Sequence, residues 1–403
     1  MDPMRILLAD KLSDQGLAQL SAAGLTVIYE PALSEKALTS ALREHAPHVL
    51  VVRSTKVLKA DISASNKLEL IVRAGAGYDT IDLEAASAAG VFVANCPGKN
   101  AVAVAELTIG GLLSLDRSLP DNVMDARQGV WNKGLYAKAS GLKGRTLGVV
   151  GLGNIGLEVI KRAKALEMHI VAWSRSLTDD RARELGILRV GSPIDVAARA
   201  DAVTLHVAAT PDTHKLANEA FFGAMKPGAF FINTTRASVV DEEALTDAIR
   251  NKGIRAFLDV LSNEPSSKEG PLQHPLAENP SIYLSHHIGA STAEAQDAVA
   301  SEAARVILEY AARGEVPNCV NLAVQSPATH QLTVRHEDRV GVLVTVLDAI
   351  RKAGWNIQEM ENVIFDGAKA ACAYIRFDGD VDSAVVEEIS QLDHILAVSL
   401  IEI

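Results

Sequence analysis

A glycine-rich turn near the middle of the chain narrows its possible folds more than any other segment does. The turn follows the apolar run Thr146–Val150, opens a segment of helical periodicity and reads Gly151-Leu152-Gly153-Asn154-Ile155-Gly156. The first glycine permits a tight turn, the second lets a pyrophosphate approach the backbone, and the third lets the helix pack closely on the strand. Free N–H groups at the helix start then face the phosphates. The segment therefore predicts a dinucleotide-binding unit, with a purely structural turn as the alternative.

Apolar runs of strand length alternate with helical segments on both sides of this turn. Continuous apolar strands between helices indicate a parallel sheet that is covered on both faces. We therefore predict an α/β fold with two doubly wound lobes, a flavodoxin-like substrate lobe and a Rossmann nucleotide-binding lobe, linked by long helices over 100–117 and 293–312. The expected strands are Ile6–Ala9, Thr26–Tyr29, Val49–Val52 and Leu70–Arg73 in the first lobe, and Thr146–Val150, Ile170–Trp173, Ala202–His206, Ala229–Asn233, Arg255–Val260 and Ile282–Ser285 in the second.

The last part of the chain has a different periodicity. Residues 314–330 contain Pro317, Pro327 and small polar side chains, which is typical of a linker. The segment 331–403 then reads strand-helix-strand-strand-helix-strand, a ferredoxin-like βαββαβ unit, with its first helix over 340–353. We therefore expect a discontinuous substrate lobe over 1–100 and 286–322, a nucleotide-binding lobe over 101–285, and a C-terminal domain over 331–403.

Charge and composition exclude several classes of partner. The net charge is −11 and aromatic residues make up 4% of the chain, which argues against nucleic acid and anionic membranes. Cys96, Cys319 and Cys372 lie far apart and predict neither a metal site nor a disulfide framework. No apolar run reaches the roughly 18 residues of a membrane-spanning helix, and the first residues do not read as a signal peptide. We expect a cytoplasmic protein without a metal.

The end of the second nucleotide-lobe strand bears on the choice of cofactor. An NAD-preferring site usually has Asp or Glu about 20 residues after the glycine turn, where it binds the ribose 2′-hydroxyl. This chain instead has Ser174 and Arg175 after the strand. A hydroxyl and a guanidinium suit a 2′-phosphate, so the sequence favours NADP or dual use over strict NAD. The alternative is that Arg175 is a solvated surface charge.

Three polar residues follow strand ends in the second lobe, where ligands of open α/β sheets collect. They are Arg236, Glu264 and His287. Arginine offers a fork for a carboxylate, histidine titrates near neutrality, and a nearby carboxylate raises the pKa of a histidine. Together they suit hydride transfer at a hydroxyl-bearing carbon, with His287 as base. Each residue alone also fits a solvated or structural role.

The motifs of residues 4–322 resemble those of the D-isomer-specific 2-hydroxyacid dehydrogenases. Besides the glycine turn, they are the segments 233–236 with 239–245, 259–260 with 264–265, and 287–292. The resemblance implies that Arg236 binds substrate and that Glu264 pairs with a catalytic His287. It also implies cofactor contacts for His206, Val207, Thr234, Asp259 and Gly289, with Asp259 at the nicotinamide carboxamide. The chain departs from the family in having Ala237 after the arginine, where glycine is usual, and His286 before the catalytic histidine, where proline is usual.

The segments 51–56, 72–79 and 95–100 resemble the phosphoglycerate dehydrogenase branch of this family. That branch implies that Arg53 and Ser54 approach a substrate phosphate. It also implies that N–H groups of Gly75 and Ala76 hold the substrate carboxylate, with Asn100 nearby. The expected reaction is oxidation of 3-phosphoglycerate in serine synthesis. The glyoxylate and hydroxypyruvate reductases, many of which use NADP, are the first alternative, and a nicotinamide-sensing corepressor-like binding protein is an alternative of another class.

The segment 331–403 resembles an ACT domain, an amino-acid-sensing unit that commonly pairs side by side. The resemblance rests on segments 336–343 and 354–357. It implies a homodimer or homotetramer and an amino-acid effector such as L-serine, contacted by His336, Asp338 and Asn356. Asp338 stands where asparagine is common and Val340 where proline is usual, so a dimerisation module without a ligand is the alternative.

Overall fold

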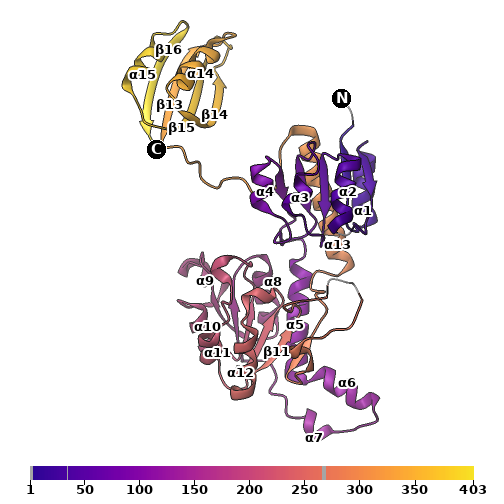
Figure 1. The fold of residues 1–403 in the computed structure, drawn as a ribbon. Coiled ribbons are helices and arrows are strands. Elements are labelled where there is room, and N and C mark those ends of the chain that lie inside the picture. The colour runs from indigo at the N-terminus through magenta and orange to yellow at the C-terminus, as the bar shows by residue number, and fades with distance from the viewer. Residues whose placement is uncertain (1–2, 34, 266–268) are drawn as a thin grey trace. The chain divides into compact units, whose positions relative to one another are not determined.

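The computed structural model describes residues 3–33, 35–265 and 269–403. The chain forms two compact units, Met1–Asn321 and Leu322–Ile403. The first unit holds two parallel sheets and the second holds one antiparallel sheet (Figure 1). The predicted fold class is thereby confirmed, while the exact limits of the two lobes within the first unit stay a prediction.

The first sheet has five parallel strands in the order β2-β1-β3-β4-β5. Apolar side chains on both of its faces are fully buried, because α1 and α13 cover one face and α2, α3 and α4 cover the other. The strands are β1 (Arg5–Leu8), β2 (Thr26–Tyr29), β3 (Val49–Val52), β4 (Leu70–Arg73) and β5 (Phe92–Ala94), and the helices are α1 (Asp14–Ala22), α2 (Glu35–His45), α3 (Lys59–Ile62), α4 (Leu83–Ala88) and α13 (Ala293–Arg313).

The second sheet has seven parallel strands in the order β12-β11-β10-β9-β6-β7-β8. The strand order reverses between β6 and β9, and in open α/β sheets the carboxyl ends of the strands at such a point are where a ligand-binding crevice is expected. The strands are β6 (Thr146–Val150), β7 (His169–Trp173), β8 (Leu188–Arg189), β9 (Ala202–Leu205), β10 (Phe230–Asn233), β11 (Arg255–Leu258) and β12 (Ile282–Leu284).

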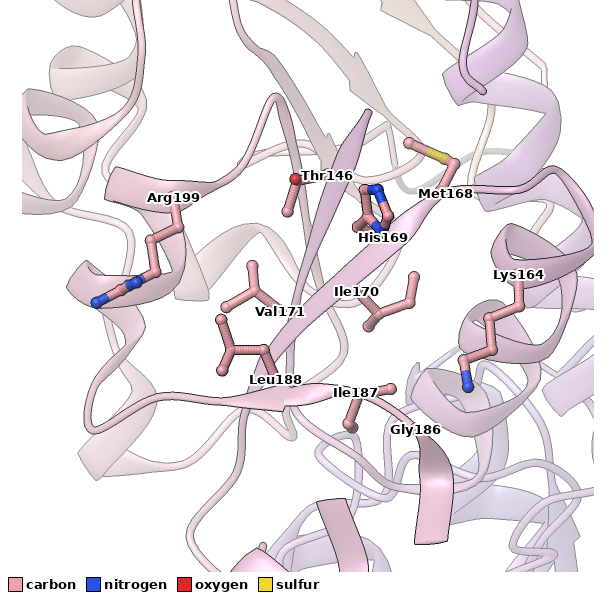
Figure 2. A pocket seen from close by; sticks show the side chains of 10 residues that line it. All are labelled: Thr146, Lys164, Met168, His169, Ile170, Val171, Gly186, Ile187, Leu188 and Arg199. Atoms are coloured by element: carbon pink, nitrogen blue, oxygen red, sulfur yellow. The ribbon is translucent and has the colours of Figure 1, made fainter. Parts of the chain in front are cut away.

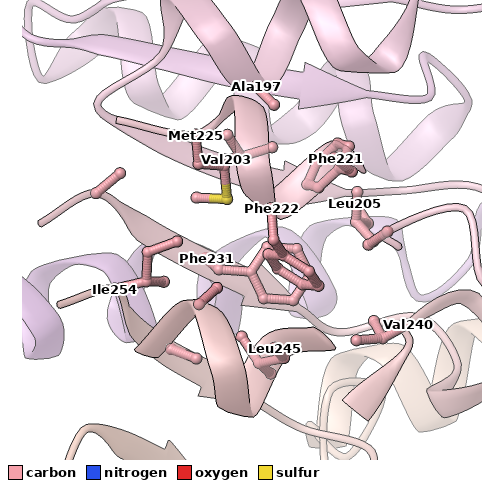
Figure 3. Close-up of a cluster of buried hydrophobic side chains, with 14 of the residues drawn as sticks. Ala197, Val203, Leu205, Phe221, Phe222, Met225, Phe231, Val240, Leu245 and Ile254 are labelled. Atoms are coloured by element: carbon pink, nitrogen blue, oxygen red, sulfur yellow. The ribbon is translucent and has the colours of Figure 1, made fainter. Parts of the chain in front are cut away.

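Helices cover both faces of the seven-stranded sheet. On one face, Phe221, Phe222 and Phe231 form an edge-to-face cluster, and the rings of Phe222 and Phe231 lie 5.0 Å apart (Figure 3). The helices of this face are α10 (Pro193–Arg199), α11 (Glu219–Ala224) and α12 (Glu242–Lys252), and those of the other face are α5 (Ala101–Arg117), α8 (Asn154–Ala165) and α9 (Asp179–Leu185). Short 3₁₀ turns lie at η1 (Pro211–Thr213), η2 (Ala237–Val239) and η3 (Pro275–Glu278).

Two short helices that the sequence reading did not predict follow α5. They are α6 (Leu119–Arg127) and α7 (Lys133–Tyr136), neither of which has a buried residue. In Figure 1 they stand away from the seven-stranded sheet. Their apolar side chains lie in solvent, with Trp131 between them 87% exposed.

The second unit is a four-stranded antiparallel sheet in the order β14-β15-β13-β16 with two helices. The elements are β13 (His330–Glu337), α14 (Val342–Lys352), β14 (Asn356–Ile364), β15 (Ala370–Asp378), α15 (Ser383–Ser390) and β16 (Ile395–Glu402). This is the predicted βαββαβ order. The predicted start of the first helix at Val340 is wrong by two residues, because Gly341 has φ +94°, which a continuous helix does not allow, and Val340 is fully exposed.

Candidate active site

The glycine turn has the shape of a phosphate cradle. A Cβ atom on Gly151 would lie 2.4 Å from the carbonyl oxygen of His206, and one on Gly156 would lie 2.2 Å from the carbonyl oxygen of Gly151. A Cβ atom on Gly153 would meet no atom within 4 Å. Gly153 caps α8 without a side-chain hydrogen bond, and the first turn of α8 has no acidic residue. The open space above free helical N–H groups fits a dinucleotide pyrophosphate.

His206 lies beside this cradle and is buried. Its ring Nε2 is 3.0 Å from the hydroxyl oxygen of Thr204, and its Nδ1 has no hydrogen-bond partner among the described residues. Burial lowers the pKa of His206 to about 3, so the ring is neutral. A buried ring nitrogen without a partner next to the glycine turn is a second observation that fits a bound cofactor.

Ser174 and Arg175 directly follow β7, at the edge of the same crevice. The Arg175 guanidinium lies 3.5 Å from the carboxylate of Asp212, which comes from η1 after β9, and both side chains are largely exposed. Asp212 was not singled out from the sequence. It supplies a carboxylate close to Arg175, although none stands at the end of β7 itself.

The Glu264 carboxylate and the His287 ring form a hydrogen bond, with Glu264 Oε2 2.8 Å from His287 Nδ1. The hydrogen bond to Glu264 raises the pKa of His287 above its ordinary value, against the opposite effect of burial. Burial of Glu264 favours its protonated form, but hydrogen bonds from His287 and from the N–H of Leu261 keep its pKa below the ordinary value. The adjacent His286 is exposed.

The loop that presents His287 is held by Asp259. One carboxylate oxygen of Asp259 accepts from the hydroxyl of Ser285 at 2.6 Å and from the N–H of Ile288 at 2.9 Å. The other oxygen accepts from the N–H of Gly289 at 2.8 Å. His287 itself has φ +52°, an uncommon conformation for a residue with a side chain. The structure thus shows Asp259 bracing the histidine loop, which is a function that the sequence did not indicate.

Arg236 forms a two-pronged ion pair with Asp79. Its Nε and Nη2 donate to the two carboxylate oxygens at 3.0 and 2.9 Å, and its Nη1 donates to the carbonyl of Thr235 at 2.9 Å. Asp79 lies after β4 and Arg236 after β10, so the pair brings the carboxyl ends of the two sheets together. Although burial opposes it, the Arg236 guanidinium holds the pKa of Asp79 below its ordinary value.

A second guanidinium, that of Arg73 at the end of β4, joins this pair, and the three side chains form one charged cluster. A Cβ atom on Gly75 would lie 1.3 Å from Nη1 of Arg73, so the guanidinium covers that glycine. Burial and the neighbouring Arg236 lower the pKa of Arg73 to about 10, with Arg53 contributing further. Its Nε has no partner among the described residues. The sequence reading missed Arg73, although it is a cation at the carboxyl end of a buried strand.

Of the other predicted substrate residues, Arg53 acts electrostatically on Arg73, and Gly75 lies under the Arg73 guanidinium. Asp10 accepts the N–H groups of Arg53, Ser54 and Thr55 at 2.7 to 2.9 Å, so these amides are already occupied. The N–H of Gly75 donates to the carbonyl of Arg73 at 2.8 Å.

Asn100 begins α5, and its side-chain oxygen is buried without a partner in the described part of the chain. Thr234 is buried, and its hydroxyl lies 3.1 Å from that of Thr108. Ala76 and Val207 are half-buried.

In the second unit, the candidate effector residues differ in exposure. His336 is buried, with its Nδ1 2.8 Å from the carbonyl of Glu337 and its Nε2 3.2 Å from Oδ1 of Asn362. Asn356 at the start of β14 and Asp338 directly after β13 are both exposed. His336 therefore already has partners within its own unit.

A pocket of about 580 Å³ lies elsewhere on the nucleotide-binding lobe (Figure 2). It is lined by Thr146 and His169, which begin β6 and β7, and by Leu188 of the edge strand β8. These are the amino ends of the strands, opposite the glycine turn, so this pocket is not the candidate active site.

Neither a metal site nor a membrane-spanning helix is found in the described residues. No group of three or more His, Cys, Asp or Glu side chains is placed to hold a metal ion among them. None of the helices within these ranges is long and apolar enough to cross a membrane. Cys96, Cys319 and Cys372 are all free thiols.

Comparison with known proteins identifies relatives for the whole chain. Residues 109–289 match the model of the D-isomer specific 2-hydroxyacid dehydrogenase, NAD binding domain. The D-3-phosphoglycerate dehydrogenase of Escherichia coli is 33% identical over 397 residues, covering 97% of this chain and 94% of that protein. The protein of the same name in Methanocaldococcus jannaschii is 37% identical over 322 residues, and the match covers 79% of this chain but only 60% of that longer protein.

Two solved structures resemble the chain in fold and carry different cofactors. The NADPH-dependent glyoxylate/hydroxypyruvate reductase of Sinorhizobium meliloti, in complex with NADP and malonate, is 28% identical with a TM-score of 0.67, covering 79% of this chain and 97% of that one. The NAD⁺-bound 3-phosphoglycerate dehydrogenase of Entamoeba histolytica is 25% identical with a TM-score of 0.66, covering 80% of this chain and 100% of that one.

Proposed function

Because the chain belongs to the D-isomer specific 2-hydroxyacid dehydrogenase family, we propose that it oxidises 3-phosphoglycerate to 3-phosphohydroxypyruvate, as the first step of serine synthesis from that compound. One observation supports this substrate above others: Arg236 and Arg53 both act electrostatically on the guanidinium of Arg73, within a protein of net charge −11. A substrate with both a carboxylate and a phosphate needs such a local concentration of cations.

His287 is the base in the proposed mechanism. Its Nδ1 is engaged by Glu264, so its Nε2 takes the proton of the C2 hydroxyl. Glu264 stabilises the imidazolium that results, as the raised pKa of His287 indicates. Arg236 holds the substrate carboxylate and the C2 oxygen, while Arg53 and Arg73 meet the phosphate. When bound, a nicotinamide cofactor supplies the hydride acceptor.

The chain's own residues also bind and orient that cofactor. The N–H groups at the start of α8, from Gly153 onward, would hold the pyrophosphate, and His206 would contact the dinucleotide. We propose that Asp259 both braces the histidine loop and meets the nicotinamide carboxamide. Ser174 and Arg175 would bind a ribose 2′-phosphate, which favours NADP or the use of both cofactors over strict use of NAD. The pairing of Arg175 with Asp212 weakens this preference without removing it.

Reduction of glyoxylate or hydroxypyruvate with NADPH is the second candidate. The same three residues, Arg236, Glu264 and His287, suit this reaction, and the Sinorhizobium reductase carries NADP in a similar fold. Against it stands the second unit, whose βαββαβ fold fits an ACT domain that senses an amino acid such as L-serine. A corepressor-like protein, in which the dinucleotide controls association, is the candidate of another class, and it does not account for that unit either.

We further propose a cytoplasmic homodimer or homotetramer. The apolar side chains of α6, α7 and their connection are exposed, including Val123, Met124 and Trp131, which is a costly surface for an isolated chain. A second copy of the chain covers this segment in the proposal. Sedimentation velocity of the full chain and of Trp131→Ser tests it, and a wild-type monomer at micromolar concentration contradicts it.

The proposed activity is tested by absorbance at 340 nm with 3-phosphoglycerate, 3-phosphohydroxypyruvate, glyoxylate and hydroxypyruvate. Each is assayed with both cofactors, with and without L-serine. The phosphorylated pair is expected to have the highest kcat/KM, and His287→Ala to abolish turnover while cofactor binding persists. A higher kcat/KM with glyoxylate or hydroxypyruvate transfers the assignment to the second candidate. Turnover that survives in His287→Ala overturns the mechanism.

A further inference from the structure

The donors of Arg236 can be accounted for one by one. A guanidinium has five N–H groups in a fixed plane. Two of them, on Nε and Nη2, are held by the Asp79 carboxylate, and one, on Nη1, is held by the carbonyl of Thr235. One N–H group remains on each terminal nitrogen, and these two share one edge of the plane when the Thr235 carbonyl accepts the Nη1 hydrogen that lies nearer to the Cδ of the same arginine. That edge can receive a second pair of oxygens while the first pair stays bound.

Gly77 permits this arrangement. A Cβ atom there would lie 2.1 Å from Nη2 of Arg236 and 3.0 Å from Oδ1 of Asp79. The ion pair therefore lies directly against the backbone of the loop after β4. Any side chain at position 77 would displace the guanidinium from the carboxylate.

The Asp79 carboxylate also interacts electrostatically with the guanidinium groups of both Arg73 and Arg236. It favours the charged form of Arg73, and both Arg73 and Arg236 hold the pKa of Asp79 down. Arg236 in turn acts on His287, whose charged neighbours are Glu264, Arg236 and Asp259. Glu264 and Asp259 raise the pKa of His287 and Arg236 lowers it, so a carboxylate that balances Arg236 affects the base indirectly.

We propose that Asp79 is a positioning residue of the reaction: it fixes the Arg236 guanidinium so that the one free edge receives the carboxylate and C2 oxygen of the hydroxy acid, and it balances the charge of Arg236 beside His287. The inference deepens the proposed dehydrogenase function and rests on it. Asp79 touches neither substrate nor cofactor in this scheme and acts through Arg236.

The test compares Asp79→Asn with the wild type and with Asp247→Asn. The control removes the same charge and an arginine partner, Arg250, from an exposed helical pair outside the site. In steady-state assays with 3-phosphoglycerate, Asp79→Asn is expected to raise KM and lower kcat, with a fall in kcat/KM of roughly 10²-fold because Arg236 loses its fixed orientation. Asp247→Asn is expected to match the wild type. Asp79→Glu keeps the charge and is expected to recover part of the loss.

A second measurement does not depend on turnover. The imidazole signals of the protein without added substrate are followed by NMR across pH, with His287 identified by the signal that His287→Asn removes. In Asp79→Asn, Arg236 is no longer balanced, so the pKa of His287 is expected to fall, whereas Asp247→Asn leaves it unchanged. Gly77→Ala, which displaces the guanidinium but keeps every charge, is expected to lower kcat/KM as Asp79→Asn does.

The outcomes separate this inference from the proposed function. If the wild type turns over none of the four hydroxy-acid or oxo-acid substrates, the proposed function fails, and the inference fails with it. If the wild type is active and Asp79→Asn equals or exceeds it in kcat/KM, only the inference is overturned, because Asp79 is then a bystander or a competitor for Arg236. A folded Asp79→Asn with an unchanged pKa of His287 overturns the charge-balancing part.

Discussion

The carboxylate of Glu264 lies 2.8 Å from Nδ1 of His287 and fixes which nitrogen of that ring remains available. The N–H of Leu261 holds the other carboxylate oxygen at 3.0 Å, so the carboxylate is tied to its own loop while it contacts the histidine. The pair is arranged to favour a protonated ring, and the pKa of His287 is raised in consequence. The pH dependence of the proposed reaction follows from this relationship.

Oxidation needs a neutral His287 as base, so its kcat/KM is expected to rise with pH through the raised pKa of that ring, above the ordinary 6.5. Reduction needs the protonated ring and is expected to fall over the same range. Glu264→Gln removes the charge that raises the pKa of His287, so the pH profiles of oxidation and of reduction both move to lower pH. The kcat/KM is also expected to fall on the order of 10²-fold. Profiles of initial rates in both directions check this, with the exposed Glu184→Gln as control. pH profiles of Glu264→Gln that coincide with those of the wild type would contradict the assignment of His287 as the base that pairs with Glu264.

Substitutions at two glycines of the turn, Gly153 and Gly156, are expected to separate folding from cofactor binding. Gly153→Ala adds a methyl group in open space, so the melting temperature is expected to stay unchanged. The methyl group occupies the space through which the cofactor approaches the N–H groups of α8, so the Kd for the cofactor is expected to rise. Gly156→Ala places a methyl group 2.2 Å from a backbone oxygen and is expected to cost about 1–3 kcal/mol of stability. Thermal melts and cofactor titration by fluorescence measure both effects. Equal cofactor affinity in Gly153→Ala and the wild type would rule out this cradle.

Cofactor preference is expected to depend on two exposed side chains. Arg175→Ala removes the cation proposed to bind the 2′-phosphate, so KM for NADP rises several-fold while KM for NAD changes little. Asp212→Asn frees Arg175 from its neighbour at 3.5 Å and lowers KM for NADP. Because both charges are exposed, each effect weakens as salt is added. If KM changes equally for NADP and NAD in Arg175→Ala, the residue does not bind the ribose 2′-phosphate.

The fold could be predicted because its signals are local. The strand before the glycine turn was predicted with its observed limits, Thr146–Val150, since a buried parallel strand is a continuous apolar run. Helices α6 and α7 were not predicted because their apolar residues are exposed. Neither helix therefore has a buried face that would produce a periodic pattern of apolar residues in the sequence. The start of α14 was misplaced because a glycine at positive φ delays the helix.

The partners of the site residues depend on the tertiary structure instead. Asp79 and Arg236 are 157 positions apart, and nothing in either local segment indicates that they meet. Asp259 was assigned to the cofactor by resemblance, but its bonds to Ser285, Ile288 and Gly289 arise from the packing of β11 beside β12. For Arg73 the sequence does carry a local signal, because it is a cation at the end of a buried strand and close to Gly75.

Glu302 on α13 joins parts of the first unit that are distant in sequence. Its carboxylate accepts from Arg305 at 2.6 and 3.1 Å and from the side-chain N–H of Asn318 at 2.8 Å, and Lys99 lies 3.3 Å away. Hydrogen bonds from Arg305 lower the pKa of Glu302 to about 2, against the opposing effect of burial. A carboxyl group whose pKa is lower in the folded chain stabilises it above the ordinary value and loses that contribution as pH falls through the folded value.

The expected result is therefore a loss of stability in acid that depends on this one side chain. Between about pH 4.5 and pH 2, the free energy of unfolding of the wild type falls more steeply than that of Glu302→Gln, which is less stable at pH 7 and has no charge there to lose. Denaturant titrations of the full chain across this range measure the difference, and the exposed Glu315→Gln should follow the wild-type curve. Parallel curves for the wild type and Glu302→Gln would show that the charge of Glu302 contributes nothing, because the pKa shift and the stability it provides are two measures of the same interaction.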